Sequence, residues 1–414
     1  MDHKTEIVVM GLGYIGLPTA SIMATKGYRV VGVDLSAEIV NTINGGKIHI
    51  VEPDLDILVK SAVNSGNLKA SLAPEEADTF IIAVPTPFAA TEDNPFAPDI
   101  SYVEAAARSI APFLSQGNLV ILESTSPVGT TERVRDIIRE LRPDLFESTL
   151  NHHLSSAVFI AHCPERVLPG RIIRELVDND RVIGGIDKAS ATKARDLYKS
   201  FCSGNIFLTD ARTAEMVKLT ENTFRDVNIA LANELSMICD LLGVNVWELI
   251  ELANKHPRVS ILKPGPGVGG HCIAVDPWFI VAAAPMQAKL IRAAREVNES
   301  KPHWVVERVR KRAERFVKPV IGCLGLSYKA DVDDIRESPA MEITRNIMKL
   351  GLGEVMVCDP YVSSARAGFE LHDLEKVVCE ADILVVLVDH SDFSDVDRDL
   401  LKEKVVIDTR GIWR

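Results

Sequence analysis

The sequence lacks any framework that would tie its cysteines together. Seven cysteines are scattered at positions 163, 202, 239, 272, 323, 358 and 379, with no C-x-x-C pair among them. An odd number at this spacing opposes both a disulfide framework and a zinc site, so we expect no bound metal and a reducing cytoplasm. Most of the seven have apolar neighbours and are predicted to be small buried hydrophobes. Cys272, with glycine and histidine nearby, is the exception.

Long apolar runs and positive net charge are missing as well. No run approaches the length of a membrane span, and residues 1–6 lead directly into a strand-like segment rather than a signal peptide. We therefore expect no membrane insertion. The formal net charge of −12 argues against non-specific nucleic-acid binding, which requires basic patches. It still allows a phosphorylated small molecule in a local basic pocket.

The length and composition are those of a globular chain with more than one domain. The 414 residues exceed one ordinary hydrophobic core, and 47% are apolar while 25% are charged. Short apolar runs alternate with helix-like stretches at both ends, a pattern typical of parallel sheets covered on both faces. We predict an α/β fold with two doubly wound, Rossmann-like domains joined by a long central helix and a helical middle domain. The expected strands are residues 7–10, 29–34, 79–84, 118–123, 319–324, 354–359, 382–388 and 405–408, and the expected helices are 17–26, 213–243, 246–254 and 287–301.

The two ends of the chain also echo each other in sequence. The stretch EADTFIIAVPTPF near residue 80 is similar to EADILVVLVDHSDF near residue 385, and VILESTSP is similar to VVIDTRG. Repetition of this kind favours two domains of one architecture.

A glycine-rich turn follows the first expected strand and opens the first expected helix. Gly11, Gly13 and Gly16 form G-x-G-x-x-G, and Asp34 ends the next strand 18 residues after Gly16. In this context the glycines allow a pyrophosphate to approach backbone N–H groups at the helix N-terminus. Asp34 would accept hydrogen bonds from ribose hydroxyls, and its charge would repel a 2′-phosphate. The pattern therefore favours NAD over NADP.

Polar loops follow two further strands at the ends where open α/β sheets bind ligands. Thr86 in Pro-Thr-Pro and Thr125 in Ser-Thr-Ser-Pro are candidates to hydrogen-bond cofactor or substrate, or are simply turn and cap residues. Residues 164–170 form another loop with charged residues among prolines, which is either functional or a solvated turn.

Several cations stand out in a chain that is acidic overall. Lys218, Asn222 and Arg225 are four and three residues apart in the central helix and share one face, as a solvated stripe or as a site for an oxygen-rich ligand. The segments HPRV at 256–259 and YK at 328–329, together with Arg336, could supply the charge that a nucleotide diphosphate needs, or could be surface decoration.

The stretch GPGVGGHCIAVD at 265–276 places four glycines within six residues, ahead of Cys272 and Asp276. Such a loop suits close approach of the backbone to another group. A reactive thiolate needs an electropositive setting, which His271 and a lysine from the central helix could provide, with Asp276 orienting that lysine or a water. Beside NAD, a cysteine can hold an aldehyde as a thiohemiacetal, which is oxidised to a thioester and hydrolysed to a carboxylate.

Six motifs in order resemble those of the nucleotide-sugar 6-dehydrogenases. They are GLGYIGLP, ESTSPVGTTE, CPERVLPG, AEMVKLTENTFRDVN, GPGVGGHCIAVDPWF and YKADVDDIRESPA, and they span essentially the whole chain. Members of this family oxidise C6 of a UDP- or GDP-sugar to a uronate. HPRV and GGHCIAVDPWF are most similar to the branch that acts on UDP-N-acetyl-D-mannosamine. The UDP-glucose branch usually has Pro-Lys-Asp where this chain has Ala274-Val275-Asp276.

The resemblance implies a role for each matching residue. Cys272 would be the nucleophile, Lys218 an acid/base or oxyanion-stabilising cation assisted by Asn222, and Asp276 would position Lys218 or water. Glu165 and Thr125 would help to deliver the hydrolytic water. Substrate contacts would be Arg166, Val167, Lys218, Asn222, Arg225, His256, Arg258, Gly269, Tyr328 and Lys329, and NAD contacts would be Gly11, Gly13, Tyr14, Ile15, Gly16, Asp34, Thr86, Thr125 and Arg336.

The resemblance also implies an organisation and a partner. Residues 1–208 would bind NAD, residues 209–310 would form a helical dimerisation domain with the cysteine loop, and residues 311–414 would bind the UDP-sugar. The long central helix would pair two subunits in a homodimer, and the product would serve a surface polysaccharide.

Three alternatives stay open at this point. The first is the same chemistry on UDP-N-acetylglucosamine, which differs from the mannosamine only at C2. The second is a catalytically silent NAD-binding scaffold, which would not need Cys272, Lys218 and Asp276 together. The third is a single-hydride alcohol dehydrogenase, which would consume one NAD per product rather than two.

Overall fold

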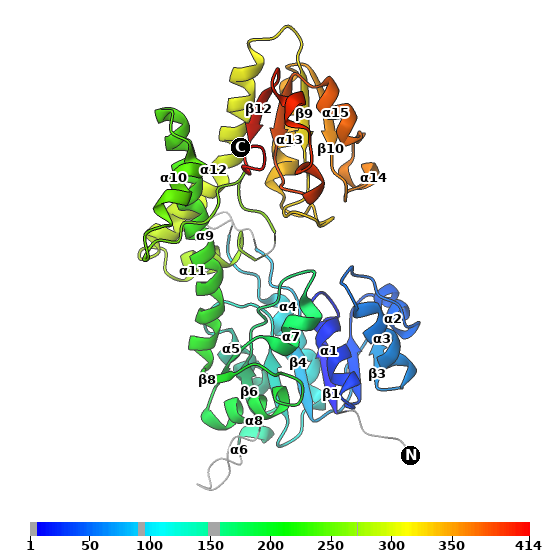
Figure 1. Cartoon of the computed structure of the whole chain (residues 1–414). Coiled ribbons are helices and arrows are strands. Elements are labelled where there is room, and N and C mark those ends of the chain that lie inside the picture. Colours follow the sequence, from blue (N-terminus) through cyan, green and yellow to red (C-terminus); the bar gives the residue numbers. More distant parts are fainter. Residues whose placement is uncertain (1–5, 90–95, 148–157, 271) are drawn as a thin grey trace. The chain divides into compact units, whose positions relative to one another are not determined.

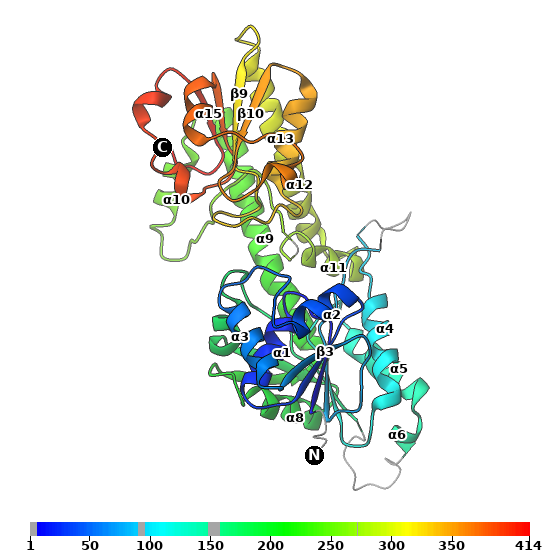
Figure 2. The ribbon, with the colours of Figure 1, turned by 90° about the vertical axis from the view of Figure 1, so that its right-hand side faces the viewer.

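The structure is a computed structural model that describes residues 6–89, 96–147, 158–270 and 272–414. The chain divides into two compact units, residues 1–220 and 221–414, and each is described here by itself. Figures 1 and 2 show the ribbon from two sides.

The first unit is built on a sheet whose described strands lie in the order β3-β2-β1-β4-β5-β6-β7-β8. Figure 1 shows this unit in colours from blue to green. Its first six strands pair in parallel in the order of a doubly wound dinucleotide-binding fold. The sheet departs from that pattern where β7 runs antiparallel to β6. The strands are β1 (Ile7–Met10), β2 (Val30–Val33), β3 (Leu68–Ser71), β4 (Thr79–Ile82), β5 (Leu119–Leu122), β6 (Phe159–His162), β7 (Arg181–Gly185) and β8 (Ile206–Asp210).

Helices cover both faces of this sheet because its strands are apolar on both sides. In β1, Ile7 and Val9 belong to one apolar cluster with α1, α3 and α7, whereas Val8 and Met10 belong to a second cluster with α4 and α5. The helices are α1 (Gly16–Thr25), α2 (Ala37–Asn44), α3 (Leu55–Asn64), α4 (Ser101–Ile110), α5 (Thr130–Leu141), α6 (Asp144–Glu147), α7 (Ile172–Asp178) and α8 (Lys188–Tyr198), with a 3-10 turn η1 (Ala111–Phe113).

A 32-residue helix, α9 (Ala211–Leu242), begins in the first unit and continues into the second. It contains neither proline nor glycine, and Gly243, at φ +69°, follows its last residue. The other helices of the middle section are α10 (Val246–Ala253), α11 (Asp276–Ala283) and α12 (Lys289–Ala313). The expected helix 287–301 is too short, since α12 continues beyond Pro302, where Val305, Val306 and Val309 enter the core of the following sheet.

Buried polar groups join α9 to α12 within the second unit. Arg295 on α12 forms an ion pair of 2.7 Å with Asp226 on α9, and their side chains are 3% and 0% exposed. The Asn298 amide donates to Asp226 (2.8 Å), and Asn233 donates to Asn298 (2.9 Å). Asn233 in turn accepts the backbone N–H of Gly265 at 2.8 Å, so the glycine loop starts from a fixed point on α9.

The second unit ends in a parallel sheet of order β10-β9-β11-β12. This order matches β2-β1-β4-β5 of the first unit, and the sequence echo joins equivalent strands, β4 with β11 and β5 with β12. The predicted fold of two Rossmann-like domains with a helical middle section is confirmed. The elements are β9 (Val320–Leu324), β10 (Glu354–Cys358), β11 (Ile383–Val386), β12 (Val405–Asp408), α13 (Pro339–Leu350), α14 (Ser364–Ala367), α15 (Leu374–Glu380), η3 (Ser391–Phe393) and η4 (Arg398–Leu401).

The sequence pattern missed four strands, which are no shorter than the strands that it predicted. β3, β6, β7 and β8 have four or five residues each, and charged residues such as Lys69 and Arg181 interrupt their apolar character. Within the described ranges, no helix combines the length and apolar character needed to cross a bilayer.

Candidate active site

The glycine-rich turn after β1 has the geometry expected of a dinucleotide site. Gly11 has φ +91°, and a Cβ on Gly16 would lie 1.9 Å from the Gly11 carbonyl oxygen, so the turn cannot close with a larger residue there. A Cβ on Gly13 would meet no described atom within 4 Å, which leaves backbone open to a ligand. The Asp34 carboxylate accepts the N–H groups of Leu12 (3.1 Å) and Ser36 (3.0 Å) and is only partly buried.

These residues fit NAD. Asp34 is held beside the turn with lone pairs left for ribose hydroxyls, and the turn leads into the N-terminus of α1, where an anion is favoured. Tyr14 and Ile15 lie in the turn itself, with Tyr14 36% exposed. The structure thus brings Gly11, Gly13, Gly16 and Asp34 together as the sequence predicts.

Thr86 and Thr125, which follow β4 and β5, are also neighbours. The Thr86 hydroxyl donates to the Thr125 carbonyl at 2.6 Å. In this arrangement Thr86 offers a ligand an acceptor rather than the donor that the sequence suggests. The two residues lie at the carboxyl edge of the same sheet, after β4, which pairs with β1, and after β5, which pairs with β4.

Glu165 lies in a buried charge cluster, not in a solvated turn. It is 6% exposed, its Oε2 lies 3.1 Å from Arg181 on β7, and its Oε1 accepts the N–H of Arg166 (2.7 Å). The Arg181 guanidinium stands over the ring of Tyr198, at 4.7 Å from its centroid. Tyr198 donates to Glu123 at 2.6 Å.

Sequence reasoning missed Arg181 and Tyr198 because each ends or interrupts an apolar segment and belongs to no motif. It missed Glu123, the first residue of ESTSPVGTTE, because it gave a role only to Thr125 of that motif. Burial, with a smaller effect of the nearby Glu165, raises the pKa of the Glu123 carboxyl to about 7. Two carboxyl groups therefore share one arginine, and Glu165 is the one paired with it directly.

The beginning of α9 is anchored by a carboxylate. Glu215 accepts the N–H groups of Gly129 (2.6 Å) and Thr131 (2.7 Å) at the start of α5. Lys218 follows three residues later and is 8% exposed. Asn222, one turn further on, is 6% exposed, whereas Arg225 is exposed. The predicted triplet thus divides into two buried residues and one that faces solvent.

Cys272 and Asp276 lie on the turn that leads into α11. The Cys272 side chain is exposed, and its carbonyl accepts the N–H groups of Val275 (3.1 Å) and Asp276 (2.9 Å). Asp276 is the first residue of α11, where the helix dipole favours a carboxylate, and it is 3% exposed. Its Oδ2 accepts the amide of Asn222 at 2.5 Å, which ties this turn to α9. His271 lies outside the described residues.

The glycine loop approaches the carboxyl edge of the second sheet. A Cβ on Gly269 would lie 2.4 Å from the Glu337 carbonyl oxygen and 3.1 Å from the Tyr328 Cβ, and one on Gly270 would meet the Tyr328 ring at 3.1 Å. A small pocket of about 20 Å³ lies there. Its lining residues are Pro266, Gly267, Ser327, Tyr328, Lys329, Pro339, Ala340, Leu387, Val388, Asp389 and Arg410.

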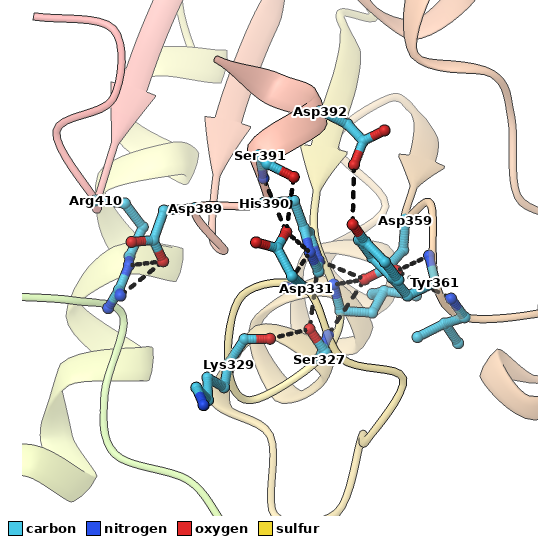
Figure 3. A network of polar contacts seen from close by, with 12 residues as sticks. Ser327, Lys329, Asp331, Asp359, Tyr361, Asp389, His390, Ser391, Asp392 and Arg410 are labelled. Carbon is cyan, nitrogen blue, oxygen red and sulfur yellow. Dashed lines mark hydrogen bonds and ion pairs between the residues drawn. The ribbon is translucent and has the colours of Figure 1, made fainter. Parts of the chain in front are cut away.

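Arg410 and Asp389 were not identified from the sequence. The Arg410 guanidinium pairs with the Asp389 carboxylate through Nε (2.8 Å) and Nη2 (2.7 Å), as Figure 3 shows. The usable signal was the polar loop DTRG after the last strand, which has the same position as the Thr125 loop in the first sheet.

The remaining predicted contact residues are more dispersed. Arg336 forms an ion pair with Asp334 (2.6 Å) and is 46% exposed, and His256 and Arg258 are exposed on the turn after α10. Neither His256 nor Arg258 is among the described residues that line the small pocket. Arg166 donates to the Asp180 carbonyl, and Val167 packs against the core of the first unit.

The prediction for the other cysteines is confirmed in part. Cys163, Cys239, Cys323 and Cys358 are buried, and burial raises the pKa of the thiols of Cys163, Cys323 and Cys358 to about 12. It is wrong for Cys379, which is exposed because it lies near the end of the short helix α15. No disulfide joins cysteines in the described part of the chain.

Fold and site together define a dinucleotide-dependent dehydrogenase with a second, nucleotide-binding sheet. Residues 5–202 match the NAD binding domain, residues 212–300 the central domain and residues 322–414 the UDP binding domain of the UDP-glucose/GDP-mannose dehydrogenase family. The chain belongs to this family. It is an NAD-dependent nucleotide-sugar dehydrogenase with a UDP-sugar binding domain.

Its relatives cover the full length of the chain. It is 58% identical to an NDP-N-acetyl-D-galactosaminuronic acid dehydrogenase of Ralstonia nicotianae, over 100% of this chain and 97% of that protein. It is 53% identical to the UDP-N-acetyl-D-mannosamine dehydrogenase of Escherichia coli, over 99% of both. The solved UDP-D-ManNAc dehydrogenase from Pyrococcus horikoshii is 43% identical, with a TM-score of 0.88 over 99% of this chain and 96% of that one.

The buried carboxyl of Glu123 gives a prediction about pH. Its pKa is about 7 in the folded chain and near 4.5 when solvated, so folding binds a proton between these values and stability falls as pH rises through about 7. We expect Glu123→Gln to remove this loss, so that its melting temperature relative to the parent is higher at pH 8 than at pH 5. The 2.5-unit separation corresponds to a change on the order of 3 kcal/mol.

The control is Glu38→Gln, an exposed carboxyl on α2. Burial lowers the pKa of His162 to about 3, so this residue makes stability rise with pH in the acid range. Its contribution is the same in parent and variant and cancels when their melting temperatures are compared. A difference in melting temperature between Glu123→Gln and parent that stays constant from pH 5 to 8 would contradict the prediction.

Proposed function

We propose that the chain oxidises C6 of UDP-N-acetyl-D-mannosamine to the mannosaminuronate. The observation that carries the proposal is the turn at α11, where an exposed Cys272 stands four residues before a buried Asp276 held by Asn222. This arrangement suits a nucleophile beside a fixed polar group better than a structural cysteine.

The reaction is a four-electron oxidation in two stages. Bound NAD supplies the hydride acceptor, and two molecules are consumed for each uronate. Between the stages, the Cys272 thiolate adds to the C6 aldehyde as a thiohemiacetal. Loss of hydride converts this adduct into a thioester, and water then releases the carboxylate and regenerates the thiol.

The other residues hold charge or water in place. Lys218 and Asn222, one turn apart on α9, would stabilise the developing oxyanion at C6, and Asp276 would keep the Asn222 amide oriented. Glu165 and Thr125 would direct the hydrolytic water. Arg181 fixes one oxygen of Glu165 and the Arg166 N–H fixes the other, so the direction of this carboxylate is set in advance.

The second sheet would receive the nucleotide. Tyr328 and Lys329 follow β9, Arg410 follows β12, and all three line the pocket beside the glycine loop. In an open parallel sheet, ligands bind at the carboxyl ends of strands where the order reverses, which here lies between β9 and β11. Arg166, Val167, Arg225, His256, Arg258 and Gly269 are proposed as further substrate contacts, and Arg336 as a further NAD contact.

A second candidate substrate is favoured by one comparison. The Ralstonia relative, at 58% identity, is named for N-acetyl-D-galactosaminuronic acid, whereas relatives named for N-acetyl-D-mannosamine share 52 to 54%. The proposal keeps the mannosamine because the motif HPRV and the solved structures at 43% identity support it.

We also propose a cytoplasmic homodimer that serves surface-polysaccharide synthesis. The dimer is supported by Phe224, Leu231 and Ile238, which recur every seven residues on α9 and are 65%, 46% and 44% exposed. The cytoplasmic location is supported by a chain whose described cysteines form no disulfide.

Replacement of Cys272 by serine should abolish uronate formation, with at least about a thousandfold loss of kcat, because an alkoxide does not replace the thiolate. NAD binding, measured by calorimetry, should be retained. In the parent, absorbance at 340 nm and product analysis should give two NADH per uronate. The matched control is Cys379→Ser, which removes the other exposed thiol and should leave turnover unchanged. Full turnover by Cys272→Ser, or a ratio of one NADH per product in the parent, would exclude the covalent route.

The sugar is tested with purified UDP-N-acetylhexosamines. We expect kcat/KM for the mannosamine to exceed that for the glucosamine, its C2 epimer, and for the galactosamine, which differs at C2 and C4, by at least about tenfold. A misplaced hydroxyl or acetamido group leaves polar groups unpaired. Preference for the galactosamine would establish the second candidate, and equal turnover of all three would remove the assignment to one sugar.

The dimer is tested by placing a charge on α9. Leu231→Glu should shift the mass measured by light scattering from dimer to monomer, because a carboxylate would be desolvated in the helix pair. Leu400→Glu, at a leucine of similar exposure on η4, is the control and should stay dimeric. A monomeric parent would refute the proposal.

A further inference from the structure

The second sheet contains a counterpart of the ribose-binding carboxylate of the first. Asp34 follows β2, the neighbour of β1, and accepts the N–H of Leu12 in the turn after β1. Asp359 follows β10, the neighbour of β9, and accepts the N–H of Leu326 in the turn after β9 at 2.7 Å. Each carboxylate therefore ties the loop after the first strand of its domain to the adjacent strand.

The two carboxylates differ in what covers them. Asp34 is partly exposed, but the Asp359 side chain is 0% exposed, with the His390 Nε2 at 3.2 Å from its Oδ2. The Tyr361 ring stacks on His390, with centroids 5.0 Å apart and planes at 28°. Asp359 is thus not accessible to a ribose, and its carboxylate hydrogen-bonds to groups within the domain instead (Figure 3).

The hydrogen bonds around His390 define its tautomer. Its Nδ1 accepts the N–H of Asp331 at 3.0 Å, so this nitrogen carries no proton. The ring proton is therefore on Nε2, which faces the Asp359 carboxylate, an acceptor only, and the Ser327 Oγ at 3.3 Å.

A serine, histidine and aspartate so arranged do not form a hydrolase triad. The Ser327 hydroxyl is 0% exposed and donates to the Lys329 carbonyl at 2.7 Å. The histidine nitrogen remote from the serine accepts the N–H of Asp331 at 3.0 Å, and the Asp331 carboxylate is farther from it, at 3.8 Å, so it is not the hydrogen-bonded carboxylate of a triad. The cluster has no accessible nucleophile, so its role is in the loop that it holds.

That loop carries Tyr328 and Lys329, which line the small pocket. It is bound on both sides of these residues, through Ser327 before them and Asp331 after them. Asp331 has φ +59°, a strained conformation for a residue other than glycine, and its carboxylate accepts both the N–H (2.9 Å) and the hydroxyl (3.1 Å) of Ser391. The segment after β11 therefore contacts the loop through both His390 and Ser391.

We propose that His390 is a positioning residue for the nucleotide: as the Nε2–H tautomer it couples Asp359 to the loop and presets Tyr328 and Lys329 for a nucleoside diphosphate. The inference rests on the proposed function, which assigns Tyr328 and Lys329 to the nucleotide. Presetting the loop lowers the entropy lost on binding, so its effect belongs to substrate affinity rather than to chemistry at C6.

Two variants separate the two ends of the imidazole. His390→Gln retains a donor that can reach Asp359 but loses the acceptor for Asp331, whereas His390→Asn retains an acceptor near the Nδ1 position. We expect His390→Gln to raise the Kd of UDP and the KM of the UDP-sugar by roughly tenfold, with kcat and the Kd of NAD within about twofold. His390→Asn should recover part of the affinity. The control is His372→Gln, at a half-buried histidine of the same domain whose described ion pair is with Glu370.

The outcomes distinguish this inference from the proposed function. A parent that binds no UDP would refute the nucleotide site itself. A parent that binds UDP, with a folded His390→Gln that binds it equally well, would refute the positioning role alone. If neither variant folds, nitrogen NMR of the parent with labelled histidine at pH 7.5 tests the proposal. The His390 signal is assigned by its change in chemical shift in Tyr361→Leu. An Nε2–H tautomer supports the proposal, and an Nδ1–H or doubly protonated ring overturns it.

Discussion

The buried ion pair between Asp226 and Arg295 is the constraint on which the second unit depends. Both side chains are removed from solvent, and burial raises the pKa of the Asp226 carboxyl in spite of Arg295 and Asn298. Such a pair contributes little to net stability, but loss of one partner leaves an uncompensated charge and costs about 3–5 kcal/mol. The pair therefore favours the one packing of α12 on α9 in which Arg295 meets Asp226. Hydrogen bonds between Asp226 and Asn298, between Asn298 and Asn233 and between Asn233 and Gly265 connect this ion pair to the loop that carries Cys272.

The glycines of the loop let its backbone lie close to neighbouring residues. Gly269 and Gly270 allow the backbone to lie against Glu337 and Tyr328, so the segment that leads to Cys272 also forms one wall of the pocket at the second sheet. Asp276 then fixes the far end of the loop to α9 through Asn222. The short stretch of chain from Gly265 to Asp276 is thus anchored at both ends by buried polar contacts.

The two Rossmann-like domains show how one architecture serves two ligands. In each, an aspartate after the second strand accepts an N–H from the turn after the first. In the first domain this aspartate, Asp34, remains partly exposed. In the second, His390 and Tyr361 cover it, and it becomes the centre of the network in Figure 3. The difference arises from side chains after β11 and β10, while the strand order is the same.

Much of this could be predicted from the sequence, because it depends on local order along the chain. The turn from Gly11 to Gly16 with Asp34, the buried strands, the long α9 and the proximity of Cys272 to Asp276 all follow from residue types at short separations. Contacts between distant segments could not be predicted in this way. The reversal of β7, the pairing of Glu165 with Arg181 and the position of Arg410 carry no local pattern.

The sequence by itself determined the class of fold and the cofactor, and it set where the cysteine proposed as nucleophile lies along the chain. The tertiary structure alone decided which carboxylates are buried, which are paired and which remain open to a ligand. Hydrophobic periodicity and glycine turns act over a few residues, whereas desolvation and ion pairing depend on groups brought together from across the fold. Asp34 and Asp359, alike in position and unlike in surroundings, show that difference most directly.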